Sequence, residues 1–290
     1  MAIKLGGGGG SASQIDEVVY LNNDADTVTL DDERVYLKGG VYETTVSTYP
    51  LAKTSFKYLG TNFTTAAQDT TPQGITWDGT YFWVGGSNST KVLKYNSSGV
   101  FVSSFSVSSQ VATVKGVIND GTYIWVLDSY TNKVHKYSQA GVYQNVFWTF
   151  SEGTESKGLT FDGTHVWVSN QSTGYADHYK YTVAGVYTNV TWSSYAQYDY
   201  GRTLAWTGTH FWVADANGLI SEYTSAGVYT GKTMNVNPPT SSLAGITYKD
   251  GSLFLLSNSG GPVYELAPTI GIGSNNIAVA GVGQNYVRVK

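Results

Sequence analysis

Apolar residues in this chain occur in short runs that alternate with polar residues, and one such pattern recurs five times. Its first copy contains the runs Gly74–Trp77 and Tyr81–Val84, joined by the polar turn Asp78–Thr80. The copies start at residues 74, 116, 158, 203 and 245, so their spacings are 42, 42, 45 and 42 residues. A period near 42 residues with strand-like content is typical of a β-propeller blade.

Each repeat predicts four antiparallel strands. Asp-Gly between two β-rich runs predicts a tight hairpin, because Gly adopts the positive φ that such turns need. A third strand such as Lys91–Tyr95 follows, then a second Gly turn at Ser98–Gly99 and an outer strand. A lone blade would leave two apolar faces in water, so the blades are expected to pack radially around an axis.

A large apolar residue recurs in the second strand of every repeat. We expect it to be buried between blades, because a hydrophobic period tied to the turn usually marks a core. The alternative is a row of exposed rings that stack on sugars or bases. The residues at this position are Trp83, Trp125, Trp167, Trp212 and, in the fifth copy, Leu255.

The fifth repeat lacks an outer strand, and a matching segment precedes the first repeat. Residues 56–65 align with residues 94–103, so an amino-terminal strand is expected to complete the last blade and remove two open edges. The sequence therefore predicts an all-β fold with a five-bladed β-propeller in residues 54–268.

The two ends of the chain differ in character from the repeats. Residues 1–53 combine a glycine-rich tether with short predicted strands at 17–21, 26–30 and 34–37. So small a β module is expected to depend on docking or oligomerisation for stability. Residues 269–290 are predicted to form a β segment that packs on this module or on a neighbouring chain.

Composition removes several classes of function. The chain has no Cys, which excludes disulfides, thiol catalysis and zinc–thiolate sites. Its net charge of −4 gives no basic field for nucleic acid. The start of the chain is too short for a signal peptide, and no run of apolar residues is long enough to span a membrane. We therefore expect neither secretion nor membrane insertion.

One face of the disc is expected to carry the second-to-third strand loops and the crossings between blades, and with them the variable residues. Residues predicted directly before the inner strands are Gln73, Lys115, Lys157, Arg202 and Ala244. Residues predicted just after the second strands are Gly86, Asp128, Asn170, Asp215 and Asn258. The longest loops are predicted at 170–177, with Tyr175, and at 193–202, with Tyr195, Tyr198 and Tyr200.

Tyrosines beside Asn, Asp and basic residues suit the binding of a glycan or a protein surface, because they offer apolar area and hydrogen bonds at low entropic cost. The alternative for the carboxylates and amides is structural: they cap turns and tie neighbouring blades, with the basic residues as ion-pair partners. The candidate ligand-binding residues are Tyr175, Tyr195, Tyr198, Tyr200, Arg202, Lys115, Lys157, Asp128, Asn170, Asp215 and Asn258.

Catalytic motifs are missing from the sequence. The four His lack the spacing of a metal site, and no nucleophile elbow, phosphate loop or zinc helix is present. We therefore expect no enzymatic activity, no metal and no cofactor. A carboxylate pair of Asp128 and Asp215 leaves a glycosidase as an alternative, whose outcome would depend on the distance between the two groups.

Two resemblances add to these inferences. The repeat resembles NHL-type propeller repeats over residues 54–268, which implies the propeller fold. The chain also resembles virion structural proteins of tailed bacteriophages. The features that carry this resemblance are the opening Met1–Leu5 with its glycine run, the acidic β module, the Thr-, Ser- and Tyr-rich repeats and the stretch Ala67–Thr80.

The phage resemblance implies a function and a location. A terminal segment would anchor to the particle and a β domain would project outward, for host attachment on tail or fibre or for capsid decoration. Other virion proteins would be partners through residues 1–53 and 269–290, in several copies, after assembly in the host cytoplasm. The alternatives are a free carbohydrate-binding lectin and a propeller glycosidase or lyase.

Overall fold

The structure, a computed structural model, divides into two compact units, one of Tyr58–Ala267 and one of Met1–Lys57 with Pro268–Lys290. The described residues are 4–6, 17–18, 34–37, 40–43, 55–152, 155–172, 175–196, 201–215, 218–235 and 243–269. All regular elements within these ranges are β-strands. The division predicted from the sequence, at residues 53 and 268, and the anchoring role of the ends stay predictions.

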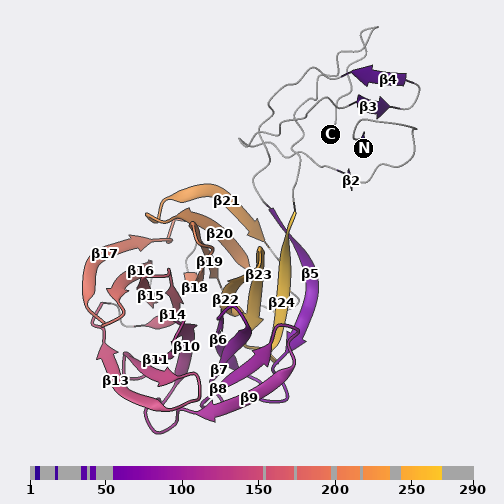
Figure 1. Cartoon of the computed structure of the whole chain (residues 1–290). Coiled ribbons are helices and arrows are strands. Elements are labelled where there is room, and N and C mark those ends of the chain that lie inside the picture. The colour runs from indigo at the N-terminus through magenta and orange to yellow at the C-terminus, as the bar shows by residue number, and fades with distance from the viewer. Residues whose placement is uncertain are drawn as a thin grey trace. The chain divides into compact units, whose positions relative to one another are not determined.

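The larger unit is a five-bladed propeller, as predicted (Figure 1). Blade 1 contains β6 (Pro72–Trp77), β7 (Tyr81–Gly86), β8 (Lys91–Asn96) and β9 (Phe101–Ser106). Blade 2 contains β10 (Val114–Asn119), β11 (Tyr123–Asp128), β12 (Lys133–Ser138) and β13 (Tyr143–Thr149). Blade 3 contains β14 (Ser156–Phe161), β15 (His165–Ser172), β16 (Tyr175–Thr182) and β17 (Tyr187–Ser193). Blade 4 contains β18 (Gly201–Trp206), β19 (His210–Asp215), β20 (Leu219–Thr224) and β21 (Tyr229–Asn235). Blade 5 contains β22 (Leu243–Lys249), β23 (Ser252–Ser257), β24 (Pro262–Thr269) and β5 (Ser55–Thr64).

The ring closes through β5, which precedes the first repeat in the sequence. Figure 1 shows β5 lying beside β24, and the two strands are neighbours in one sheet. Beyond the end of β5, Thr65 N donates a hydrogen bond to Gly261 O at 2.8 Å. Within the blade, Asn62 Nδ2 donates to Glu265 Oε2 at 2.8 Å. The predicted completion of the last blade by an upstream strand is thus confirmed.

The inner strands of neighbouring blades approach closely at the glycine that opens the repeated pattern. A Cβ on Gly74 would lie 2.8 Å from Gly116 Cα in the next blade, and a Cβ on Gly116 would lie 3.1 Å from Leu159 N. Contact between blades therefore requires glycine in blades 1 and 2, whereas blade 4 accommodates the buried Thr203 at this position.

The recurring Trp is a wedge between blades, as expected. Trp83, Trp125, Trp167 and Trp212 are each no more than 2% exposed. Trp83 of blade 1 packs in one cluster with Val107, Val114 and Val117, which follow it toward and into blade 2. Burial of such rings stabilises each interface by roughly 2–3 kcal/mol.

The fifth wedge is Phe254, not Leu255 as the sequence alignment predicted. Thr247 pairs with Phe254, whereas in blade 1 the corresponding pair is Thr76 with Trp83. Phe254 then packs on Phe82 of blade 1, with ring centroids 5.0 Å apart. The cause is the turn of blade 5, which is shifted by one residue relative to the turns of the other blades.

The smaller unit contains a four-stranded sheet in the order β2-β1-β3-β4. Its strands are β1 (Lys4–Gly6), β2 (Glu17–Val18), β3 (Arg34–Leu37) and β4 (Gly40–Glu43). The predicted strand at 26–30 and the segment after Thr269 lie outside the described residues.

Candidate functional site

The crossing face of the propeller is the face that carries the crossings between blades and the turns between second and third strands. The two kinds of segment contact each other in blades 2 and 3. Ser129 N donates to Thr113 O at 3.2 Å, and Gln171 N donates to Glu155 O at 2.9 Å. The predicted site residues that the structure describes belong to this face or to strand ends that meet it.

The first predicted ring of residues lies inside the inner strands, not before them. In each blade the pairing of the inner strand with the second strand shifts register at this position. Such a bulge redirects a side chain and marks the rim of a ring. The residues at the bulges are Gln73, Lys115, Lys157, Arg202 and Ala244.

The bulge residues differ in what they contact. Lys115 Nζ lies 3.4 Å from Gln73 Oε1 and so joins blades 2 and 1. Lys157 Nζ pairs with Glu155 Oε2 at 3.1 Å, so its ion-pair partner is a neighbour on its own crossing. Both Lys are half-buried, and Ala244 is buried. Arg202 occupies the equivalent place in β18, but its side chain lies outside the described residues.

Asp128 is a buried structural carboxylate. It is fully inaccessible and accepts hydrogen bonds from Ala112 N and Thr113 N, both at 3.1 Å. It also accepts from Tyr130 N at 3.0 Å and Thr131 Oγ1 at 2.8 Å. Asp128 therefore ties the crossing into blade 2 to the turn after β11, as the structural alternative proposed.

Asn170 and Asp215 have comparable roles. Asn170 Oδ1 accepts from Glu155 N at 2.7 Å, and Asp215 Oδ1 accepts from Leu219 N at 2.8 Å. Both residues are buried. In blade 5 the register places Ser257 at this position, opposite Leu243, so Asn258 lies one residue beyond the predicted ring.

Blade 1 reaches the same arrangement with a residue that the sequence analysis missed. Its position in β7 is Gly86, and the carboxylate comes from Asp69 in the preceding segment. Asp69 is 3% exposed and accepts from Thr71 N at 2.8 Å and Ser89 N at 2.7 Å. A Cβ on Gly86 would lie 2.7 Å from Asp69 Oδ2, so the glycine makes room for this carboxylate.

The tyrosines of this face are distributed differently from the prediction. The segment 170–177 is not a loop, because β15 and β16 continue as a hairpin in which Ser172 pairs with Tyr175. Tyr195 lies in the crossing to blade 4 and is 46% exposed. Tyr130, which the sequence analysis passed over, is 80% exposed in the turn after β11. Tyr198 and Tyr200 lie outside the described residues.

The carboxylate pair considered for glycoside chemistry is not available to a substrate. Asp128 is inaccessible and its two oxygens accept four hydrogen bonds, while Asp215 is 8% exposed. A glycosidase needs both carboxyl groups at the reacting bond. These two residues therefore do not provide the accessible carboxylate pair that the glycosidase alternative requires.

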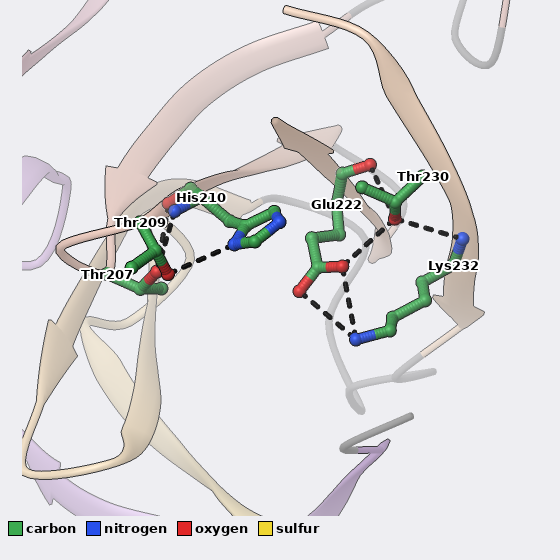
Figure 2. Close-up of polar contacts among 6 residues, drawn as sticks. All are labelled: Thr207, Thr209, His210, Glu222, Thr230 and Lys232. Carbon is green, nitrogen blue, oxygen red and sulfur yellow. Dashed lines mark hydrogen bonds and ion pairs between the residues drawn. The ribbon is translucent and has the colours of Figure 1, made fainter. Parts of the chain in front are cut away.

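A second polar cluster lies on blade 4, outside the crossing face. Glu222 is buried, accepts from Thr230 Oγ1 at 2.9 Å and pairs with Lys232 Nζ at 3.2 Å (Figure 2). In Figure 2 the imidazole of His210 points toward this group. Its Nδ1 lies 3.0 Å from Thr209 Oγ1.

The sequence contained a signal for the blade 4 cluster. In blade 1 the position opposite the wedge Trp83 is Lys94, whose Nζ lies 3.7 Å from the ring centre of Tyr81. In blade 4 the position opposite Trp212 is Glu222, and in blade 5 the position opposite Phe254 is Glu265, so the charge is reversed in two of the five copies. A charge reversal within a repeat indicates that the side chain has partners of its own, as Glu222 does on blade 4.

Two further His are buried in strands. Burial lowers the pKa of His178 to about 3, and its ring nitrogens lie 3.1 Å from Ser169 Oγ and 3.0 Å from Ser194 Oγ. Burial also lowers the pKa of His135, whose ring nitrogens have no hydrogen-bond partner among the described residues. Within the described ranges, no group of three or more His, Asp or Glu is arranged to hold a metal ion.

No helix in the described part of the chain is long and apolar enough to cross a membrane.

Comparison with known proteins supports the architecture. No protein-family model matches the chain, and no curated protein matches it. The structure of Myxococcus xanthus glutaminyl cyclase is similar at a TM-score of 0.55 and 13% identity, over 70% of this chain and 93% of that one. The PQQ-bound aldose sugar dehydrogenase of Streptomyces coelicolor is similar at a TM-score of 0.54 and 11% identity, over 76% of this chain and 100% of that one.

These neighbours correct one expectation. The sequence analysis excluded enzymatic activity, and that exclusion is wrong, because both structures just described are enzymes whose folds are similar to this one. At such low identity they establish the fold alone and transfer no reaction or substrate. Nothing in the comparisons indicates a bacteriophage protein, so the coarser statement, a propeller scaffold, is the one that stands.

Proposed function

We propose that the crossing face binds a glycan or a protein on a host surface, and that a bacteriophage particle displays this face. The observation that carries the proposal is the pair of exposed tyrosines, Tyr130 and Tyr195, 80% and 46% exposed on a face whose carboxylates are buried. Tyrosines on such segments provide apolar area and a hydroxyl with few rotatable bonds.

The polar side chains of this face suit a strongly polar ligand. Lys115 is half-buried at its bulge beside the amide of Gln73, and Lys157 is paired with Glu155 at 3.1 Å, so both charges are present at the rim. A glycan combines sugar rings, which stack on tyrosine, with hydroxyl groups that bond to such side chains.

Binding to immobilised glycans tests the proposal for the face. Tyr130→Ala and Tyr195→Ala should each weaken binding at least about tenfold if the ring stacks on the ligand, as does loss of a central aromatic contact elsewhere. Tyr198→Ala and Tyr200→Ala test the remainder of the predicted loop. Thr209→Ala is the control, because Thr209 is exposed in the turn between β18 and β19, at the strand ends opposite the crossings. Unchanged binding in all four Tyr variants would reject the face.

Display on a particle requires a separate experiment. The proposal is supported by the resemblance of the opening segment and of Ala67–Thr80 to virion proteins of tailed phages. Electron microscopy and proteomics of purified particles should find the chain in several copies, with residues 1–53 and 269–290 toward other virion proteins. Recovery only as a free monomer that binds glycans would favour the lectin instead.

A further inference from the structure

Four Asp-Gly pairs lie in the first hairpin turns of the repeats, and the structure separates one from the others. The pairs begin at Asp78, Asp120, Asp162 and Asp250. In an Asp-Gly pair the backbone nitrogen of Gly is able to attack Cγ of Asp, because Gly has no side chain to hinder the approach. The reaction requires a carboxyl group that is able to rotate toward this nitrogen.

In blades 1 to 3 the carboxylate is held by three hydrogen bonds. Asp78 Oδ1 accepts from Thr80 N at 2.8 Å and Tyr81 N at 2.7 Å, and Oδ2 accepts from Trp83 Nε1 at 2.6 Å. The same three bonds recur at Asp120, with distances of 2.7–2.9 Å. They also recur at Asp162. These bonds stabilise the ionised form and fix the orientation of the group.

Asp250 has none of these bonds, because the turn of blade 5 is shifted by one residue. Lys249 pairs with Ser252, so Lys249 takes the place that Asp78 has in blade 1, and Asp250 takes the place of Gly79. Its φ is +50°, and its side chain is 76% exposed with one contact, 3.5 Å from Lys249 Nζ.

The attacking nitrogen differs only from that of blade 2. Gly251 N donates no hydrogen bond within the described residues, and neither does Gly79 N or Gly163 N, whereas Gly121 N donates to Asn119 Oδ1 at 2.7 Å. The feature that separates blade 5 from blades 1 to 3 is therefore the unrestrained carboxyl group of Asp250.

We propose that Asp250–Gly251 is a site of spontaneous isoaspartate formation in the folded protein. Gly251 N forms a bond to Asp250 Cγ, and the carboxyl hydroxyl leaves with the amide proton as water, which gives a succinimide. Water then adds to either carbonyl of this ring. When water adds to the original backbone carbonyl, the bond from this carbonyl to the Gly251 nitrogen breaks, and the backbone then runs through Cβ and Cγ of residue 250. One water is lost and one is gained, so the mass of the product equals that of the starting chain.

The test is ageing of the folded full-length chain at neutral pH and 37 °C, followed by proteolysis and electron-transfer fragmentation that separates isoaspartate from Asp. Residue 250 should contain at least about ten times more isoaspartate than residues 78, 120 or 162, since one charge-assisted hydrogen bond accounts for such a factor. Equal amounts at the four sites, or none at 250, would overturn the proposal.

Two controls show whether the fold is the cause. In denaturant, all four Asp-Gly pairs should react at similar rates. Asp250→Glu should abolish the product in the folded chain, because the longer side chain closes a six-membered ring far less readily. A folded-state pattern that persists in denaturant would mean that local sequence, not the hydrogen bonds, sets the rates, and would contradict the proposal.

Discussion

Single residues in this propeller carry more than one task. Asp120 directly follows the inner strand β10, caps the turn through its bonds to Thr122 N and Tyr123 N, and accepts from the wedge Trp125 Nε1 at 2.7 Å. The turn role follows from the Asp-Gly pair in the sequence. The bond to the indole does not follow from the sequence, because it depends on the direction in which the Trp125 side chain leaves the second strand of the hairpin.

Replacement of this carboxylate should therefore destabilise the propeller. Asp120→Asn retains an oxygen for the backbone amides but leaves the buried indole of Trp125 without a charged acceptor. We expect the free energy of unfolding to fall by about 2–3 kcal/mol, measured by urea denaturation. The matched control is Asp250→Asn, measured directly after purification, before its Asn-Gly pair reacts. This variant should change the free energy of unfolding by less than about 0.5 kcal/mol. Equal effects would show that the indole bond contributes nothing.

The buried His178 should make the protein sensitive to acid. Burial lowers the pKa of this imidazole from 6.5 to about 3, so the unfolded chain takes up the proton at a higher pH than the folded chain. The free energy of unfolding should then decrease as the pH falls from about 6.5 toward about 3, by about 1.4 kcal/mol per pH unit.

A repeat-based variant isolates this contribution. Blades 1, 2 and 5 have Val at the position of His178, so His178→Val should keep the packing and reduce the slope of stability against pH. Part of the slope should remain, because burial also lowers the pKa of His135. An unchanged slope in the variant would assign the acid sensitivity to other groups.

At the scale of elements, an aromatic side chain near the outer edge of one blade packs against a glycine of the next blade. A Cβ on Gly185 of blade 3 would lie 2.1 Å from Cγ of Trp148, which belongs to β13 of blade 2. The same contact joins Phe63 of β5 to Gly99 of blade 1. In blades 1 to 4 the glycine of the second hairpin turn therefore serves contact between blades as well as the turn.

Two glycines with similar backbone angles separate these roles. Gly185 and Gly163 have φ of +80° and +92°, so Ala at either position should cost about 1–2 kcal/mol of backbone strain. A Cβ at Gly163 meets no atom within 4 Å, whereas one at Gly185 collides with the Trp148 ring. Gly185→Ala should thus lower the free energy of unfolding by about 1–3 kcal/mol more than Gly163→Ala in a urea titration. Equal losses would mean that only the turn needs glycine.

At the scale of the whole molecule, the closure of the ring depends on a strand from the far end of the chain. Phe63 of β5 packs on Phe82 and Tyr95 of blade 1, with ring centroids 5.3 and 5.1 Å apart. The strand thereby completes blade 5 and also covers the flank of blade 1. A propeller without it would expose both an apolar surface and the edge of β24.

Two truncations test this closure. Removal of residues 1–53 should leave the main calorimetric unfolding transition at its original temperature, because the propeller unit begins at Tyr58. Removal of residues 1–66 should lower that temperature by more than about 10 °C or cause aggregation, because a whole strand with a buried Phe is lost. Equal behaviour of the two truncated chains would contradict closure by β5.

The sequence by itself determined the architecture of this protein: the repeat length, the four strands of each blade, the wedge in four of five copies and the strand that closes the ring. These features follow from local turn chemistry and periodic hydrophobicity, both of which depend on residues close together in the sequence. Tertiary structure alone decided which carboxylates are buried. In blade 1, for example, Gly86 has no side chain, and the carboxylate of Asp69 from the preceding segment occupies the space instead. Tertiary structure also decided that Phe254 is the fifth wedge and that Asp250 is exposed, because a one-residue shift in a turn changes which side chains face a neighbouring blade.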